Sequence, residues 1–248
     1  MYQFFVEEHQ LTGDKIAILG SDVNHIKNVL RMKGGERVRV SLSDSGRSFF
    51  CVLDTITEEE VIAQIQEEDE AGTELKNKIY LFQGLPKGDK MELIIQKAVE
   101  LGADKIVPVE MARSIVKLDD KKKKDKVKRW QAIAESAAKQ SKRASIPVVG
   151  DVLSFNNAIK SFSEYDLVLL PYECKNAMND TTFALKKIER GMKIAVLIGP
   201  EGGFELKEVL DAENVGALTV SLGKRILRTE TAAITALSML MLHAEINL

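Results

Sequence analysis

Two glycine-containing segments in the C-terminal part of the chain carry the residue types best suited to hold a ligand and act on it. The first is Gly199–Phe204, with the letters GPEGGF, and the second is Leu222–Ala232, with LGKRILRTETA. Adjacent glycines such as Gly202 and Gly203 lose much backbone entropy, so the pair indicates a backbone that turns sharply or lies directly against a ligand. A tight turn between a strand and a helix explains the first segment equally well, and both interpretations stay open.

Two predicted strands position these segments. Residues Ile194–Gly199 are apolar or small and rich in β-branched side chains, which is typical of a short, fully buried strand. Ala217–Leu222 is a second strand, closed by Gly223, and helical patterns begin near Glu205 and Glu230. Because ligands bind at the carboxyl ends of parallel strands, two such loops in succession predict a pocket.

The two segments resemble the signatures of a known family, the RsmE 16S ribosomal RNA uridine-N3 methyltransferases of the SPOUT (α/β-knot) superfamily. Further matches follow in the family's order and extend over almost the whole chain. They are His25 with Val29–Arg31 and Gly35, then Gln96–Gly102, Arg113–Val116, Arg129-Trp130, and Gln140–Arg143 with Ile146-Pro147. The resemblance implies an enzyme that methylates RNA.

The resemblance also implies S-adenosylmethionine as the cofactor. The adenine and ribose of this cofactor can be recognised by backbone N–H and C=O groups, which requires a close approach of the main chain and suits glycine. Its sulfonium methyl group is already activated, so no metal is required. The residues that the resemblance implies to line the cofactor are Leu197, Ile198, Gly199, Gly202, Gly203, Leu222, Gly223, Ile226, Leu227, Arg228, Thr231 and Ala232.

A uridine N3–H must lose its proton before the nitrogen can act as a nucleophile. An enzyme can supply a base, or it can stabilise the negative charge that develops on the flanking O2 and O4 carbonyls. Arg228 is the candidate for charge stabilisation, and Glu230 and Glu201 are the candidates for the base. Structural roles are the alternatives, either as carboxylates at helix N-termini or as an Arg228–Glu230 ion pair.

The charge balance, the cysteines and the lengths of the apolar runs limit the kinds of protein that this chain can be. The 248 residues include 35 basic and 37 acidic side chains, so the net charge of −2 does not indicate a nucleic-acid partner, and any RNA contact must come from local patches. Cys51 and Cys174 are too few for a disulfide framework and lack the spacing of zinc ligands, and no metal site is evident. No charged-then-apolar leader opens the chain and no apolar run reaches the length of a membrane span, so we expect a cytoplasmic protein.

Residues 1–72 predict a small, mostly antiparallel β-barrel. A helix is expected over Asp22–Met32, and the expected strands are Lys15–Leu19, Arg37–Val40, Ser48–Asp54 and Val61–Gln66. The resemblance implies that this is a PUA-like RNA-binding domain. Its candidate basic face consists of Arg31, Lys33, Arg37 and Arg39. Solvated charges on the outward side of a sheet are the alternative for each of them.

Residues 73–248 predict an α/β domain built on a mainly parallel sheet, because strands alternate with helices. The expected strands are Ile79–Phe82, Ile106–Val109, Val148-Val149 and Asp166–Leu170, and the expected helices are Met91–Leu101, Val127–Ser141 and Thr181–Ile188. The loop after Phe82 lacks G-x-G-x-x-G, and GPEGGF lacks the Gly-Lys-Ser/Thr of a P-loop. The resemblance implies instead a SPOUT domain whose C-terminal segment forms a trefoil knot.

A run of basic residues opens the helix that carries Trp130. Its members are Lys121, Lys122, Lys123, Lys124, Lys126, Lys128 and Arg129, and Lys139, Lys142 and Arg143 continue it at the other end of the helix. Basic charge at a helix N-terminus opposes the macrodipole, so helix stability does not explain the run. The run predicts contacts with RNA phosphates, with a solvated helix face as the alternative. Trp130 lies on the apolar stripe of this helix and is predicted to be part of the core.

One position departs from the family's pattern. Glu205 follows GPEGGF where the family often has Ser or Thr, and glutamate is a poorer N-cap, although Glu208 keeps an acidic first turn. This departure weakens the expected helix start and leaves the glycine segment unchanged.

The sequence predicts two domains, and the resemblance implies an enzyme that uses S-adenosylmethionine to methylate N3 of a uridine in small-subunit ribosomal RNA, within an assembled or nearly assembled subunit. The resemblance adds a homodimer, and the apolar helix Ala232–Leu242 can serve either the core or the interface. Two alternatives stay open. One is a related SPOUT enzyme that methylates another base or a ribose, and the other is a non-catalytic RNA-binding assembly factor.

Overall fold

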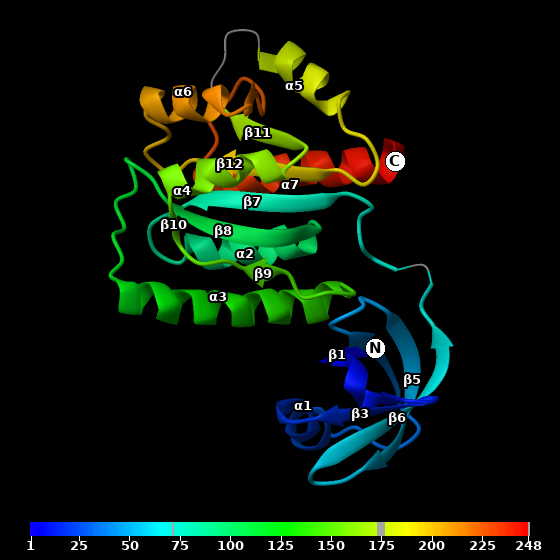
Figure 1. The fold of residues 1–248 in the computed structure, drawn as a ribbon. Coiled ribbons are helices and arrows are strands. Elements are labelled where there is room, and N and C mark those ends of the chain that lie inside the picture. Colours follow the sequence, from blue (N-terminus) through cyan, green and yellow to red (C-terminus); the bar gives the residue numbers. More distant parts are fainter. Residues whose placement is uncertain (71, 173–176, 248) are drawn as a thin grey trace. The chain divides into compact units, whose positions relative to one another are not determined.

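The computed structural model describes residues 1–70, 72–172 and 177–247, drawn as a ribbon in Figure 1. The chain forms two compact units. The first comprises Met1–Glu74 together with Ala138–Ile146, and the second comprises Leu75–Ala137 together with Pro147–Leu248. The domain boundary after residue 72 stays a prediction. No helix in the described ranges is long and apolar enough to cross a membrane.

A curled six-stranded sheet forms the first unit (Figure 1). Its strands, in the order in which they pair, are β1 (Tyr2–Val6), β4 (Arg37–Leu42), β5 (Ser48–Ile56), β6 (Glu60–Glu68), β3 (Lys15–Leu19) and β2 (Leu11–Thr12). β1 pairs in parallel with β4, whereas the other neighbours are antiparallel, and β1 also approaches β3. The four predicted strands are confirmed. β1 is not among them.

Short helical elements interrupt this sheet. They are η1 (Glu8–Gln10), α1 (Ser21–Asn24) and η2 (His25–Val29). The helix predicted over Asp22–Met32 therefore ends early. Its C-terminal part widens into a π-turn, and Arg31 adopts a left-handed conformation with φ of 54° that leads the chain out of the helix.

The core of the first unit lies on the inner face of the curled sheet. Phe4, Ile16, Val40 and Cys51 are among its fully buried side chains. Burial raises the pKa of the Cys51 thiol to about 12, so this cysteine stays neutral and serves as a small apolar residue. Cys174 lies outside the described residues.

A buried polar network covers the other face of β4. Arg39 is only 2% exposed, and its guanidinium lies 2.7 Å from Asp69 and also donates to the backbone carbonyl of Lys142. Gln3 donates to the carbonyl of Arg143 at 2.6 Å, and the Arg143 guanidinium binds both carboxylate oxygens of Glu74. Arg39 is therefore not part of an exposed basic face, because the Ala138–Ile146 segment of the same unit packs over this side of the strand.

A fully parallel sheet forms the second unit and confirms the predicted α/β class. Its strands, in the order in which they pair, are β10 (Leu153–Ser154), β8 (Ala103–Glu110), β7 (Lys78–Gly84), β12 (Lys193–Ile198), β11 (Leu167–Pro171) and β13 (Leu218–Val220), with β9 (Val148–Val149) beside β8. This order places β12 between β7 and β11. The carboxyl ends of strands from distant parts of the sequence therefore meet at one edge.

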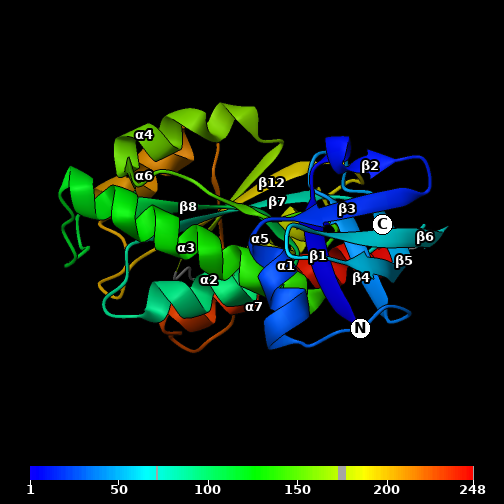
Figure 2. The same ribbon diagram turned by 90° about the horizontal axis from the view of Figure 1, so that it is seen from below.

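Helices cover both faces of the second sheet (Figure 2). They are α2 (Lys90–Glu100), α3 (Asp120–Ser141), α4 (Phe155–Lys160) with η3 (Ser161–Glu164), α5 (Ala177–Leu185), α6 (Leu206–Asn214) and α7 (Thr229–Asn247). Helices α2 and α7 contact each other on one face, and α4 and α6 lie together on the other. The strand side chains alternate accordingly, so that Phe82, Val107 and Leu197 pack towards α4 and α6.

Helix α3 begins earlier than predicted. It starts at Asp120 rather than Val127, so the lysine run lies inside its first turns. Asp119 accepts a hydrogen bond from the backbone N–H of Lys122 at 2.9 Å, and its side chain also lies 3.1 Å from the Lys122 ammonium. A carboxylate at this end offsets the unfavourable interaction of the lysines with the helix dipole. Trp130 is buried, as predicted.

The end of β7 lies directly against the first glycine segment. A Cβ added to Gly84 would come within 2.6 Å of the Pro200 backbone nitrogen and 2.7 Å of its ring, distances that no side chain tolerates. Gly84 therefore lets the backbone of the Gly199-Pro200 turn approach the central strand. This contact fixes the depth at which the turn sits on the sheet.

We expect Gly84→Ala to destabilise the fold by about 1 to 3 kcal/mol in urea unfolding, because the backbone of the turn must move to admit one methyl group. Gly150→Ala is the matched control, since its added Cβ would first meet the flexible end of Lys105 at 3.3 Å. Equal stability of the two variants would contradict this account of the turn.

Candidate functional site

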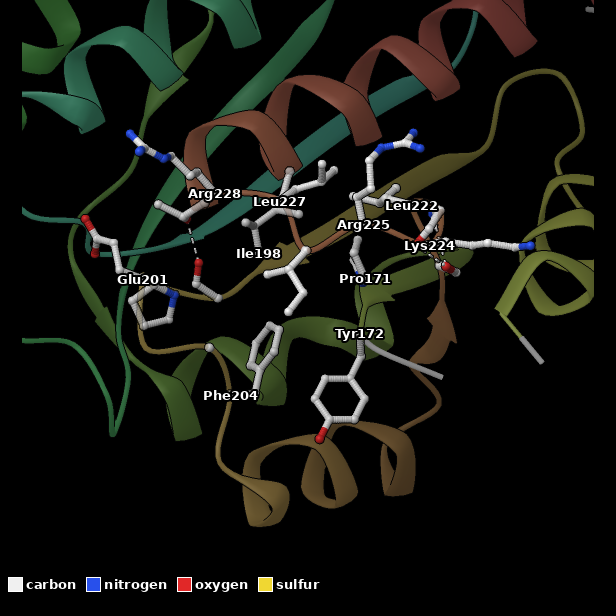
Figure 3. A pocket seen from close by; sticks show the side chains of 18 of the residues that line it. Pro171, Tyr172, Ile198, Glu201, Phe204, Leu222, Lys224, Arg225, Leu227 and Arg228 are labelled. Carbon is white, nitrogen blue, oxygen red and sulfur yellow. Dashed lines mark hydrogen bonds between the residues drawn. The ribbon is translucent and has the colours of Figure 1, made fainter. Parts of the chain in front are cut away.

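A cavity of about 1100 Å³ opens where the parallel strands of the second unit end. Its lining comes mainly from the end of β11, the turn after β12 and the loop after β13, with Lys90 of α2 and Arg113 beside them, and Figure 3 shows side chains from these segments around the cavity. Its lining residues are Lys90, Arg113, Pro171, Tyr172, Met178, Asn179, Ile198, Gly199, Pro200, Glu201, Gly203, Phe204, Ser221, Leu222, Gly223, Lys224, Arg225, Ile226, Leu227, Arg228, Thr229 and Ala232. The two segments singled out in the sequence are thus brought together in one cavity.

Most of the residues expected to line a cofactor lie in this wall, but not all of them do. Leu197 points into the sheet core on the side of α4 and α6, and Thr231 is exposed in the first turn of α7. Gly202 lies outside the lining, and its missing side chain faces Arg113, whose Cβ would be 2.9 Å from an added Cβ. The absence of a side chain at Gly202 therefore permits close packing of two loops.

Two other glycines have the conformation that the sequence pattern indicates. Gly203 and Gly223 have φ values of 69° and 109°, and no atom lies within 4 Å of an added Cβ at either position. The N–H of Gly203 closes a turn by donating to the carbonyl of Pro200 at 2.9 Å. No side chain of the described residues therefore stands between these two glycines and the cavity, while their N–H groups are held by the Pro200 carbonyl and the Ser221 hydroxyl.

A buried hydrogen-bond chain links three elements behind the cavity. The Thr229 hydroxyl donates to the carbonyl of Gly199 at 2.6 Å and accepts from the Gln83 side-chain amide at 2.9 Å. The same amide nitrogen donates to the carbonyl of Gly84 at 2.9 Å. The chain fixes the start of α7 against the ends of β7 and β12. Gln83 was not predicted as a site residue, although a glutamine within an apolar strand is a signal that could have found it.

A second pair of hydrogen bonds holds the loop after β13. The Thr181 hydroxyl of α5 donates to the carbonyl of Ser221 at 2.8 Å and accepts from its N–H at 2.9 Å. The Ser221 hydroxyl accepts from the N–H of Gly223 at 3.1 Å. Both ends of the loop between β13 and α7 are therefore anchored, one at Ser221 and the other at Thr229.

A buried carboxylate holds the loop after β12. Glu208 accepts from the N–H of Glu205 at 2.9 Å and from the N–H of Ala112 at 2.9 Å, and the Glu205 side chain returns a bond to the backbone of Glu208. This reciprocal capping box compensates for the poorer N-cap residue, so the start of α6 is not weakened as expected. Arg113 also donates to the carbonyl of Gly202 at 3.1 Å.

Lys90 connects the two acidic residues proposed as bases. Its ammonium lies 3.0 Å from a Glu201 oxygen and 3.5 Å from a Glu230 oxygen. Burial alone raises the pKa of Glu201, but hydrogen bonds from the Lys90 side chain and the Lys87 backbone outweigh it and lower the pKa below its usual value. Lys90 was not predicted as a site residue, because the sequence around it gives no sign of these two distant partners.

Arg228 has no acidic partner within the described residues. The alternative Arg228–Glu230 ion pair is not formed, since the ion pair of Glu230 is with Lys90. The Arg228 side chain is exposed at the edge of the cavity, and its backbone carbonyl accepts the N–H of Ala232 at the start of α7. Figure 3 shows its guanidinium extending away from the aromatic rings of Phe204 and Tyr172.

The residues expected to contact RNA differ in their surroundings. Arg143 is 3% exposed and held by Glu74, which gives it a structural role. Others remain on the surface but have acidic partners: Arg37 with Glu67, Lys122 with Asp119, Lys123 with Glu110, and Arg129 with Glu92. Lys142 is partly buried, and Arg31, Lys121 and Lys124 are exposed.

The lining suits an organic ligand with a flat apolar part. Ile198, Leu222 and Leu227 supply aliphatic surface, and Phe204 and Tyr172 face the same space (Figure 3). No side chain at Gly203 or Gly223 fills this space, and the volume of about 1100 Å³ is large enough for a ligand of drug size. These features fit the adenosine part of S-adenosylmethionine, and the residues present are compatible with that cofactor.

Known proteins are similar to this chain along both of its units. A family model described as an RNA methyltransferase domain matches residues 73–241, and one described as an RNA methyltransferase PUA domain matches residues 18–66. A ribosomal RNA small subunit methyltransferase E from Bacillus subtilis is 38% identical, covering 99% of this chain and 98% of its own. A protein of the same name from Mesomycoplasma hyopneumoniae is 34% identical, covering 96% and 98%.

Solved structures share the fold. A ribosomal RNA small subunit methyltransferase E from Neisseria gonorrhoeae, bound to S-adenosyl methionine, superposes with a TM-score of 0.83 at 31% identity and covers 98% of this chain and 97% of its own. A Legionella pneumophila protein in complex with the bound cofactor SAM has a TM-score of 0.83 at 30% identity, with 97% of each chain covered. These matches confirm the predicted fold class, a PUA-like sheet followed by a parallel α/β domain. The trefoil knot stays a prediction.

The hydrogen-bond chain behind the cavity generates a stability prediction. We expect Thr229→Val to lower the free energy of unfolding by about 1 to 3 kcal/mol, because the carbonyl of Gly199 and the amide of Gln83 lose a partner in a buried site. Thr229→Ser keeps the hydroxyl and should recover most of this loss. Chemical denaturation of the three proteins measures it, and a valine variant as stable as the parent would contradict the role of the chain.

The Lys90–Glu201 pair generates a pH prediction. The pKa of Glu201 is lower in the folded than in the unfolded chain, so its contribution to stability is present above the unfolded pKa and is lost as the pH falls through the folded value. The Glu201→Gln variant should therefore have a lower free energy of unfolding than the parent at pH 7. This difference should shrink below about pH 4. Glu245→Gln, at an exposed position, is the control. A difference that does not change with pH would refute the pairing.

Proposed function

Because this chain belongs to the ribosomal RNA small subunit methyltransferase E family, we propose that it transfers a methyl group from S-adenosylmethionine to N3 of a uridine in small-subunit ribosomal RNA. A methyltransferase that acts on ribosomal RNA with this cofactor follows from the family. The choice of the uracil N3 position rests on the motif resemblance and on Arg228. The observation that carries it is a guanidinium at the edge of the cavity without an acidic partner in the described residues.

We propose that the two glycine segments hold the cofactor through their backbone groups. Gly199, Gly203 and Gly223 would face its polar atoms, and Ile198 and Leu227 would contact its adenine. When bound, S-adenosylmethionine supplies an electrophilic methyl group. The residues of this chain orient it by fixing the two loops relative to each other through Thr229.

Arg228 is proposed to stabilise the deprotonated base. Losing the N3 proton leaves negative charge on the base and its two flanking carbonyl oxygens, and a planar guanidinium can neutralise this charge at two points. Glu201 and Glu230 are both ion-paired with Lys90, and the lowered pKa of Glu201 makes it a weak proton acceptor. In the mechanism that we propose, the proton therefore leaves to solvent, and these carboxylates act mainly by holding Lys90 and the loops.

The remaining parts of the proposal concern partners. We propose that residues 1–72 form the PUA-like RNA-binding domain and residues 73–248 the methyltransferase domain. Arg31, Lys121 and Lys124 remain the candidates for distant phosphate contacts. We also propose a homodimer, in which a second copy covers Leu242 and Ile246, which are exposed apolar residues of α7. The protein would act in the cytoplasm on an assembled or nearly assembled small subunit.

The direct test of the reaction uses unmodified small ribosomal subunits and cofactor with a labelled methyl group. Digestion of the RNA to nucleosides should place the label in N3-methyluridine. A label in another base or in a ribose would identify a different methylation reaction. Binding of cofactor without any labelling would favour a non-catalytic assembly factor.

Arg228 generates the mechanistic prediction. We expect Arg228→Ala to keep its fold and near-normal cofactor affinity, while the single-turnover methylation rate falls by about 10²- to 10³-fold, the size typical for removal of one charge-stabilising donor. Arg228→Lys should recover only part of the rate, since a point charge cannot reproduce the planar fork. Thermal unfolding is the control. A variant that methylates at the parental rate, or one that unfolds, would assign this role to another residue.

A further inference from the structure

The loop between β13 and α7 carries a group of basic residues at the rim of the cavity. Lys224, Arg225 and Arg228 are exposed, line the cavity and have no acidic partner among the described residues. We propose that this loop binds the phosphodiester backbone of the RNA substrate at the entrance of the cavity, with Lys224 and Arg225 as the phosphate contacts. The inference rests on the proposed function for the class of substrate.

Among the described residues, some basic residues of the second unit are paired with carboxylates, unlike those of this loop. Lys90, Lys123 and Arg129 each lie within 3.0 Å of a carboxylate oxygen, so their charge is largely neutralised within the protein. In a chain with a net charge of −2, attraction for RNA must come from local positive potential. The rim formed by Lys224 and Arg225 has that potential beside the cavity.

The loop is also held in place, which favours binding. Its first end is fixed by the hydrogen bonds between Ser221 and Thr181, and its last end by the bond from Thr229 to Gly199. A pre-positioned loop loses little further conformational freedom when a ligand binds. The loop therefore presents its cations from a fixed base rather than from a mobile segment.

The side chains between the two anchors suit a nucleic-acid strand. Figure 3 shows Lys224, Arg225 and Arg228 extending from the loop in different directions, so they can reach successive phosphates rather than converge on one anion. Ile226, which is 89% exposed, lies between them and offers apolar surface to a sugar or a base. Phosphate contacts and apolar contacts on one loop are the combination that single-stranded RNA requires.

The carboxylate of the cofactor is the competing ligand for these cations, because they also line the cavity. The two possibilities make different predictions. A phosphate contact affects RNA binding and its salt dependence, whereas a contact with the methionine carboxylate affects cofactor affinity. The experiment therefore measures both quantities on the same variants.

The test compares Lys224→Gln/Arg225→Gln with Lys160→Gln/Arg190→Gln, whose positions are exposed and outside the cavity lining. Affinity for unmodified small ribosomal subunits is measured between about 50 and 200 mM salt, and cofactor affinity is measured by calorimetry. The slope of log affinity against log salt should decrease by roughly 0.7 to 0.9 per lost phosphate contact in the first variant only. Arg225→Lys should keep the parental slope, because a lysine ammonium neutralises a phosphate as well as a guanidinium does. Cofactor affinity should stay unchanged in all of them.

Two results would overturn the proposal. An unchanged salt slope in a folded Lys224→Gln/Arg225→Gln variant would show that the loop does not contact phosphate. Weaker cofactor binding with an unchanged slope would assign both residues to the cofactor carboxylate. The binding measurement does not depend on methylation, so a wrong target base, revealed by the nucleoside analysis, would leave the loop assignment intact.

Discussion

The hydrogen-bond chain from Gln83 through Thr229 to Gly199 is the constraint on which the site depends. It joins the central strand of the second sheet, the turn after β12 and the first residue of α7 in a buried region. A hydrogen bond formed away from water is rigid, because the alternative is an unsatisfied polar group. The cavity can therefore keep its shape although its wall consists of loops. The close contact of Gly84 with Pro200 also holds the cavity wall in place, because it limits how far the turn can move towards β7.

The basic residues around the cavity fall into two groups, those that pair with a carboxylate and those that do not within the described residues. Lys90 neutralises Glu201 and Glu230 on one side of the cavity, which ties α2 to both glycine loops. In the loop between β13 and α7, Lys224 and Arg225 have no such partner in the described chain and remain available to a ligand. The formal composition conceals this division, because a nearly balanced total charge says nothing about which cations are already paired.

Local features could be predicted from the sequence, whereas long-range contacts could not. The strands before Gly199 and Gly223 were found because apolar runs ending in glycine have a local signature, and the parallel α/β class follows from their alternation with helices. Gln83 and Lys90 were missed because their partners lie more than a hundred residues away. The exposure of Arg39 was mispredicted for a related reason. The alternation of side chains along a strand distinguishes its two faces. It does not reveal that a segment as distant in sequence as Lys142 covers the face that was expected to be exposed.

The composition of the first unit has a consequence for how the protein is made. This unit is not contiguous in sequence, since Ala138–Ile146 completes it after a long excursion through the second unit. A ribosome releases residues 1–74 well before it reaches Arg143, so until then Glu74 lacks its guanidinium partner and Gln3 lacks the carbonyl to which it donates. The strand pairings and the apolar core of this sheet need no residue beyond 68 in the described chain, whereas the polar network on β4 is completed only after Arg143 has been made. The last contacts of the first unit therefore form late in synthesis.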